Sequence, residues 1–395
     1  MRPVKSVGKT VPASYSSTKW AAIIFAALGT FTALNAWAQQ ASGEAPGIYD
    51  RIWSVPVLYE NSDNSTVQSF SLVGRYHGQY WSVRADQGDA EDWENRRMIF
   101  GFNSKWFEDV TLQAQMYVKT GEGSLYNGLY VAFIEWSSPH TDLSISAGRL
   151  DYLFTGLERS TSSKKINTIE RGLLVNQLMP AEVVGAHMYG KQGKFSYQAG
   201  LFSRSIEEEF SDFDGGSAAV IGGAYDTPLF FEEGSLHLDY LYNSRSTEGN
   251  AFRPYRHIVS LWHQGKSGRL GMGMDLTVAD PLETSGFVWG LTLEPAWMLT
   301  SELFGNDDPL QLALRYQYAY ASEENGLHLQ RRYEEKVTEG EGNRYQALYA
   351  GLNYYLYSHK FKLMAGAEYA RMKDDADDGG AYRGWTWFGA VRLYF

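Results

Sequence analysis

The chain has 395 residues, a formal net charge of −11 and no cysteine, which excludes disulfide frameworks, cysteine-ligated zinc and thiol nucleophiles. A mean hydropathy of −0.36 argues against a bundle of apolar transmembrane helices. The many aromatic residues (27 Tyr, 20 Phe and 12 Trp), with 40 Gly and only 11 Pro, favour a chain built mainly of strands. The acidic total argues against a nucleic-acid partner, because clustered Lys and Arg bind phosphate backbones.

The first 38 residues have the features of a secretory signal peptide. Residues 1–19 carry four basic residues and no acidic ones, residues 20–34 are largely apolar, and a small-x-small sequence ends at Ala38. A membrane anchor is the alternative, but a membrane span needs about 20 apolar residues. We therefore expect cleavage near Ala38 and export. The mature chain would carry 31 basic and 46 acidic residues, a net charge of −15.

A polar segment, residues 39–65, separates this signal from a long region of alternating residues, 66–395. In residues 110–118, for example, apolar side chains occupy every second position, and a period of two predicts a strand. The sixteen segments predicted to be strands are 70–77, 97–105, 110–118, 129–136, 143–149, 183–189, 195–203, 217–225, 235–243, 257–264, 269–278, 287–299, 310–320, 345–357, 360–371 and 384–395.

The connections between these segments alternate between short turns and long loops. The long ones are 85–95, 151–182, 204–216, 244–255, 321–343 and 372–383. A soluble β-sandwich or β-propeller also contains alternating strands. Short turns on one rim and long loops on the other are instead typical of a bacterial outer-membrane barrel. We therefore predict an all-β protein, a transmembrane antiparallel β-barrel of sixteen strands.

Aromatic residues support this prediction in two ways. The last segment is amphipathic and ends in Phe395, as outer-membrane barrel strands that carry an assembly signal do. Aromatic side chains near strand ends suit the two girdles at the membrane interfaces. The residues predicted for the girdles are Trp81, Trp106, Trp136 and Tyr357.

Three motifs between residues 93 and 203 resemble the phosphate-selective porin O/P family. They are Trp93-Glu-x-Arg-Arg-Met-Ile-Phe-Gly-Phe102, Leu157-Glu158-x-x-Thr161-Ser162-Ser163-x-x-Ile166-x-x-Ile169-Glu170-Arg171, and Tyr197-Gln-Ala-Gly-Leu-Phe202, with a weaker match at Tyr349-Ala-Gly-Leu-Asn-Tyr-Tyr355. The resemblance implies a trimeric barrel of sixteen strands whose third long loop folds inward and narrows the pore.

Basic residues are predicted to set the selectivity of that pore. If apolar strand faces meet lipid, the opposite faces line the lumen. The pore candidates are Arg159, Lys164, Lys165 and Arg171 in residues 151–182, the third connection on the long-loop rim, and Arg75, Arg97, Arg269 and Arg315 on strands. Two acidic residues of the loop, Glu158 and Glu170, are predicted to shape it by pairing with Arg159 and Arg171. Several acidic clusters fall in the other loops, where they are solvated tips or sites for divalent cations.

The sequence thus predicts a porin for passive diffusion of small hydrophilic solutes, with anions such as phosphate favoured. One alternative is a weakly selective general pore, and another is an outer-membrane barrel with a structural or hydrolase role. The chain contains no metal-ligand spacing of His and no nucleophile motif, so we expect neither a cofactor, a metal nor an enzyme. The expected partners are outer-membrane lipid and lipopolysaccharide, two further copies of the chain in a homotrimer, and small anions.

Overall fold

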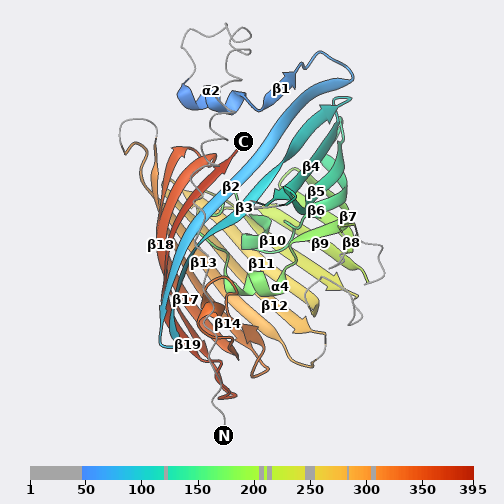
Figure 1. The fold of residues 1–395 in the computed structure, drawn as a ribbon. Coiled ribbons are helices and arrows are strands. Elements are labelled where there is room, and N and C mark those ends of the chain that lie inside the picture. The colour runs from blue at the N-terminus through green and yellow to red at the C-terminus, as the bar shows by residue number, and fades with distance from the viewer. Residues whose placement is uncertain are drawn as a thin grey trace, which may run out of the picture. The chain divides into compact units, whose positions relative to one another are not determined.

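A computed structural model describes residues 47–119, 123–203, 209–210, 216–244, 254–282, 284–303 and 308–395. Within them, sixteen strands each pair antiparallel with the next along the chain, and the last strand, β19, pairs with the first of the ring, β2 (Figure 1). The predicted antiparallel barrel of sixteen strands is therefore confirmed. The signal-peptide prediction for residues 1–38 lies outside the described residues.

The strands of the ring follow the chain order. They are β2 (Val67–Ala85), β3 (Gly88–Trp106), β4 (Val110–Val118), β5 (Tyr126–Ser137), β6 (Leu143–Asp151), β7 (Glu182–Gln192), β8 (Phe195–Ser203), β9 (Ala218–Asp226), β10 (Glu233–Asn243), β11 (Tyr255–Ser267), β12 (Leu270–Pro281), β13 (Val288–Thr300), β14 (Leu310–Ala321), β17 (Arg344–Tyr357), β18 (Phe361–Lys373) and β19 (Tyr382–Tyr394).

Smaller elements complete the structure. They are α2 (Ile48–Ser54), β1 (Val57–Glu60), α3 (Leu157–Ser160), α4 (Leu173–Leu178), β15 (Leu327–His328), η1 (Glu334–Lys336) and β16 (Glu341–Gly342). The chain divides into two compact units, residues 1–58 and 59–395, and α2 belongs to the first. Among the described residues, no helix has both the length and the apolar character that a membrane crossing requires.

The first predicted long loop, residues 85–95, is instead the tip of a hairpin. β2 and β3 remain paired up to Ala85 and Gly88, so only two residues form the turn. Cross-strand ion pairs support this extension, because Arg84 lies 3.2 Å from Asp89 and 3.5 Å from Glu91. Asp89, Glu91, Asp92 and Glu94 therefore stand on β3, and only Asp86 lies in the turn.

Side chains alternate between the two faces of the wall as the pattern predicts. In β19, Trp385 and Trp387 are 46% and 55% exposed on the outside, whereas Thr386 and Arg392 point inward and are buried. One predicted girdle residue is wrong: Trp81 is only 4% exposed. Because β2 continues to Ala85, alternation carries Trp81 to the inner face.

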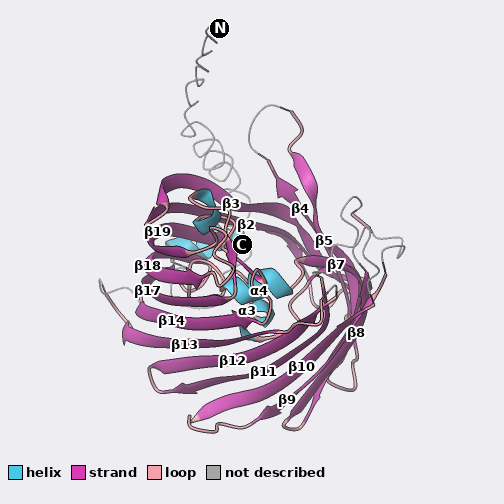
Figure 2. Ribbon diagram, turned by 90° about the horizontal axis from the view of Figure 1, so that it is seen from below, coloured by secondary structure: helices cyan, strands magenta, loops and turns pink. Residues whose placement is uncertain are grey.

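The buried apolar core lies inside the barrel and comes partly from two loops. We call residues 152–181 loop L3 and residues 322–343 loop L7. Leu173 and Leu178 of L3 belong to the same buried cluster as Leu327 and Tyr333 of L7. The view along the barrel places α3 and α4 of L3 inside the ring of strands (Figure 2). No motif or periodicity in the sequence indicates that L7 folds inward.

Candidate functional site

L3 leaves the wall after β6 and first crosses to strands on the far side of the ring. The backbone N–H of Gly156 donates to Asp239 Oδ2 on β10 at 3.1 Å, and that of Leu157 donates to Asp275 Oδ2 on β12 at 2.7 Å. Gly156 has a φ of +73°, and a Cβ there would lie 2.8 Å from Asp275 Oδ2. Glycine is required at this crossing because a side chain would suffer both backbone strain and a steric clash.

Arg315 on β14 then fixes the middle of L3. Its Nη1 donates to Glu158 Oε1 and to the carbonyl oxygen of Glu170, both at 2.7 Å, and its Nη2 donates to Glu368 Oε2 on β18 at 2.7 Å. The Arg315 side chain is 1% exposed. Glu158 also accepts the backbone N–H of Gly172 at 2.8 Å, which ties the two arms of L3 together. Arg315 is thus a buried clamp and not a free cation of the pore.

Glu170 is held by a residue that the sequence did not single out. Its Oε1 accepts Arg96 Nε at 2.7 Å and Gln79 Nε2 at 2.8 Å. The pairing of β2 with β3 shifts between His77 and Gly78, which leaves Arg96 unpaired in a β-bulge. A bulge breaks strict alternation, so Arg96 reaches the lumen beside Arg97. The prediction that Glu158 and Glu170 pair with Arg159 and Arg171 is therefore wrong.

Three further cations of the wall bind the other arm of L3. Arg75 on β2 donates through Nη1 to Ser163 Oγ at 2.8 Å. Lys362 on β18 donates to the carbonyl oxygen of Ile166, and Arg392 on β19 donates through Nη2 to that of Ile169, both at 2.7 Å. Wall cations on β2, β18 and β19 thus hold L3 at Ser163, Ile166 and Ile169.

Arg159 and Arg171 stabilise the loop from within. Arg159 Nη2 lies 2.7 Å from Asp151 Oδ1, and its Nε donates to the carbonyl oxygen of Pro180 at 3.0 Å. Arg171 donates through Nε to the carbonyl oxygen of Glu158 at 2.9 Å and through Nη2 to that of Thr161 at 2.6 Å. Both side chains are buried. Their hydrogen bonds therefore maintain the shape of L3.

The remaining predicted pore residues are more exposed and fall in different places. Lys164 of L3 lies 4.7 Å from the centre of the Tyr394 ring, and burial together with the nearby Arg75 guanidinium lowers the pKa of Lys164 to about 8. Lys165 is exposed, and Arg97 is half-buried without a hydrogen bond to the described residues. Arg269 is exposed in the turn between β11 and β12, away from L3, and donates to the carbonyl oxygen of Leu299 at 3.3 Å.

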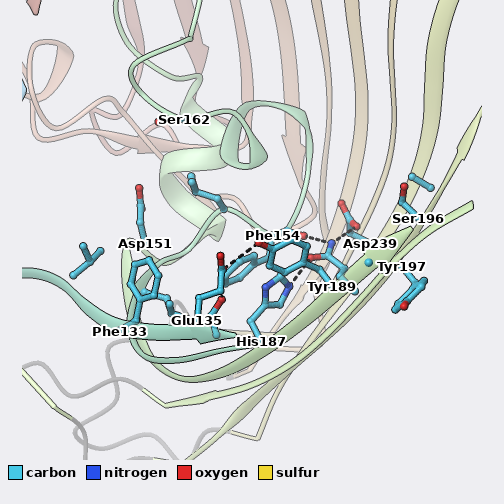
Figure 3. A pocket seen from close by; sticks show the side chains of 18 of the residues that line it. Phe133, Glu135, Asp151, Phe154, Ser162, His187, Tyr189, Ser196, Tyr197 and Asp239 are labelled. Carbon is cyan, nitrogen blue, oxygen red and sulfur yellow. Dashed lines mark hydrogen bonds between the residues drawn. The ribbon is translucent and has the colours of Figure 1, made fainter. Parts of the chain in front are cut away.

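A cavity of about 620 Å³ lies between L3 and the wall from β4 to β10. Arg75 and Lys164 border it, as do Glu135, Asp142, Asp151, Asp239 and Lys191. On the wall, the rings of Phe154 and His187 stack with centroids 3.9 Å apart, and Tyr189 continues the stack at 5.3 Å (Figure 3). This stack joins L3 to β7, so it keeps the loop at a fixed distance from the wall.

L7 packs against L3 on the other side and carries a buried carboxyl group. Gln330 Nε2 donates to the carbonyl oxygen of Arg171 at 3.0 Å, which joins the two loops. Glu334 is 0% exposed and accepts Tyr345 OH at 2.8 Å and the backbone N–H of Gln330 at 2.9 Å. Burial, with the nearby carboxylate of Glu368, raises the pKa of Glu334 to about 8.

Comparison with known proteins agrees with this arrangement. Residues 70–250 match the family described as phosphate-selective porin O and P. The resemblance drawn from the sequence motifs is confirmed. No curated protein is similar in sequence to this chain at a significant level. The family match and the fold both support an outer-membrane channel.

Solved porin structures share the fold at low sequence identity. An anion-selective porin from Comamonas acidovorans is 11% identical with a TM-score of 0.57, covering 83% of this chain and 99% of its own. OmpF of Salmonella typhi, in complex with daunomycin, is 12% identical with a TM-score of 0.56, covering 85% and 100%. The channel DcaP of Acinetobacter baumannii is 12% identical with a TM-score of 0.52, covering 86% and 100%.

The Arg315 clamp predicts that Arg315→Gln releases L3. Removing one partner of a buried ion pair leaves uncompensated charge and costs about 3–5 kcal/mol. Because Lys164 and Lys165 lie in L3, trypsin should cleave the purified variant after these residues faster than it cleaves the wild type. Arg269→Gln, the same change at an exposed turn, should leave cleavage unchanged. Equal cleavage of Arg315→Gln and wild type would contradict the clamp.

The buried Glu334 predicts that L7 opens more readily as pH rises. Opening returns the carboxyl to water, where its pKa is near 4.5, so the docked loop loses stability from about pH 4.5 up to about pH 8. Glu334→Gln carries no titratable group and should remove this dependence. The ratio of amide hydrogen exchange in L7 between wild type and variant should therefore rise with pH over that range and level off above it. A ratio that does not change with pH would refute the assignment.

Proposed function

We propose that this outer-membrane channel is a porin for passive diffusion of small hydrophilic solutes, with anions such as phosphate favoured. A single observation carries the preference. Arg75 and Lys164, at the edge of L3 that borders the cavity, form no ion pair with the described residues. Cations without counter-charges in a narrow aqueous passage raise the local concentration of anions and exclude other cations.

The other candidate cations contribute less to this preference. Arg159 and Arg315 are neutralised by Asp151 and by Glu158 with Glu368. An anion would exchange part of its hydration for donors on Arg75 and Lys164, with binding weak enough to allow exit. No nucleotide or bond-making chemistry is required, because the concentration gradient supplies the free energy.

A weakly selective pore is the second candidate, and the cavity itself favours it in one respect. Glu135, Asp142 and Asp239 border the same space and form no ion pair with the described residues. Their charges oppose those of Arg75 and Lys164. Because these three acids outnumber the two unpaired cations, the anion preference rests on the position of Arg75 and Lys164 at the edge of L3, and we expect it to be weak.

Three further features belong to the same proposal. Residues 1–38 would be removed as a signal peptide, residues 39–65 would form a polar lead segment, and residues 66–395 would form the barrel. The protein would assemble as a homotrimer, as OmpT of Vibrio cholerae does in its trimer form. Lipid and lipopolysaccharide would surround the outer wall.

Reversal potentials in a planar bilayer with a salt gradient test the selectivity. The wild type should favour anions, and Lys164→Glu should shift the reversal potential toward cations because it inverts a charge at the cavity. Lys194→Glu, the same change in the exposed turn between β7 and β8, should have a much smaller effect. A wild-type preference for cations would refute the hypothesis of an anion-selective pore. A reversal potential near zero would instead establish the weakly selective pore. Absence of conductance would refute both.

A further inference from the structure

Basic side chains gather on the outer face of the wall where four neighbouring strands, β17, β18, β19 and β2, reach the long-loop rim. They are Arg344 on β17, Arg371 and Lys373 on β18, Arg383 on β19 and Arg84 on β2, and all five are exposed. Met372, between Arg371 and Lys373, is buried on the inner face, as alternation requires. The five cations therefore face away from the lumen and do not belong to the pore.

Three of these cations have acidic partners within the chain. Arg84 pairs with two acids of β3, as described above. Arg344 Nη2 lies 3.2 Å from Asp375 Oδ2, and Lys373 Nζ lies 2.7 Å from Asp375 Oδ1. Asp374, the neighbouring acid, accepts four backbone N–H groups of its own loop. The acids of this rim are thus directed to other partners than Arg371 and Arg383.

Arg371 and Arg383 form no ion pair with the described residues, although they stand directly opposite each other in the pairing of β18 with β19. Opposed residues of antiparallel strands have Cβ atoms about 4.5–5.5 Å apart, and like charges at such positions are destabilising. Arg383 Nε donates to Tyr369 OH at 2.8 Å, and Asp86 acts on Arg383 only at longer range. An anion supplied from outside the chain would remove the repulsion between the two guanidinium groups.

Aromatic side chains mark the level of this pair relative to the membrane. Tyr369 and Trp385 are also directly opposite each other, one outward position further from the rim, with ring centroids 5.2 Å apart. Trp387 stacks on Trp385 at 6.0 Å. Such rings occupy the membrane interface, and two residues of a strand rise about 7 Å. Arg371 and Arg383 therefore lie at the level of the lipid headgroups, just beyond the aromatic girdle.

We infer that Arg371 and Arg383 bind a phosphate group of lipopolysaccharide on the outer wall of β18 and β19. The long-loop rim of such a barrel faces the outside of the cell, where lipopolysaccharide with a phosphorylated sugar headgroup forms the outer leaflet. Two guanidinium groups donate several hydrogen bonds to one phosphate, which cancels their mutual repulsion. The acyl chains lie below it, along exposed apolar residues such as Leu363 and Trp387. The inference rests on the proposed outer-membrane location and not on the solute that the pore favours.

Lipid titration of the purified barrel in a neutral detergent tests the inference, with bound lipid counted by native mass spectrometry. The probes are lipid A, the membrane-embedded part of lipopolysaccharide, with both of its phosphates, and the same lipid without them. The wild type should bind the phosphorylated form more tightly. Arg371→Gln and Arg383→Gln should each lower that affinity about fivefold, the usual contribution of one basic residue at an anionic lipid surface. Neither change should alter the affinity for the dephosphorylated lipid.

Control variants separate this charge from the fold of the barrel. Arg371→Lys keeps the charge and should keep most of the affinity. Arg269→Gln, the same change at an exposed turn of the other rim, should leave it unchanged. Equal binding of the two lipids by the wild type would overturn the inference, and so would unchanged affinity in both Gln variants.

Two further readouts distinguish this site from other roles of the surface. If Arg371→Gln and Arg383→Gln change the oligomeric state and not the lipid affinity, the surface contacts a second copy of the chain and the inference fails. Conductance in a planar bilayer should be the same in the wild type and both variants, because the two cations face lipid. A failure of lipid binding with normal conductance therefore leaves the porin function standing. Absence of conductance with normal lipid binding would refute the porin function and support the lipid site.

Discussion

A guanidinium buried inside a barrel must be neutralised, and in this protein that requirement determines the path of L3. Arg315 is almost entirely shielded from water and draws Glu158 from the loop and Glu368 from β18 to within 2.7 Å. An uncompensated charge at such a position would cost several kcal/mol. Glu158 in turn accepts the backbone N–H of Gly172 and so fixes the return of L3, whereas Asp239 on β10 accepts the N–H of Gly156 and fixes the crossing.

The remaining contacts divide the interior into a filled part and an open part. Wall cations on β2, β3, β18 and β19 bind successive points of L3, and L7 packs behind it through Gln330. The cavity lies on the other side of L3, toward β4 to β10. In the proposed channel, selectivity depends on the few charges on this side that form no ion pair with the described residues. The acidic total of the chain is a poor guide to it, because many acidic residues stand outside the lumen or in buried pairs.

Much of the fold was predictable from period-two alternation, because each wall residue faces either lipid or the interior. All sixteen predicted segments fall on strands. The predicted ends of some strands fall short, however, where charged residues continue the pairing toward the tip of a hairpin. The tip of β2 and β3 is such a case: Arg84 pairs there with Asp89 and Glu91, and a rule that assigns charged stretches to loops misses it. Trp81 was assigned to the wrong face for the same reason.

The site was less predictable than the fold, because its contacts join segments far apart in the sequence. Glu158 and Glu170 could be recognised as loop carboxylates, yet their partners, Arg315 and Arg96, come from β14 and β3. Strict alternation does not place Arg96 in the lumen, because a one-residue bulge turns its side chain to the inner face. L7 carries no period or motif that distinguishes an inward loop from an outward one. Its position follows from hydrogen bonds to L3 that exist only in the folded barrel.

In the proposed channel, the passage runs along β4 to β10, and L3 and L7 close the opposite side. The chain has no cysteine, so a single introduced thiol reports on its own site. Gln113→Cys on β4 lines the cavity, whereas Thr386→Cys on β19 points inward and is 1% exposed. A charged, water-soluble thiol reagent should modify Gln113→Cys and change its conductance while leaving Thr386→Cys unmodified. Rapid modification of Thr386→Cys, with Gln113→Cys protected, would contradict this division of the lumen.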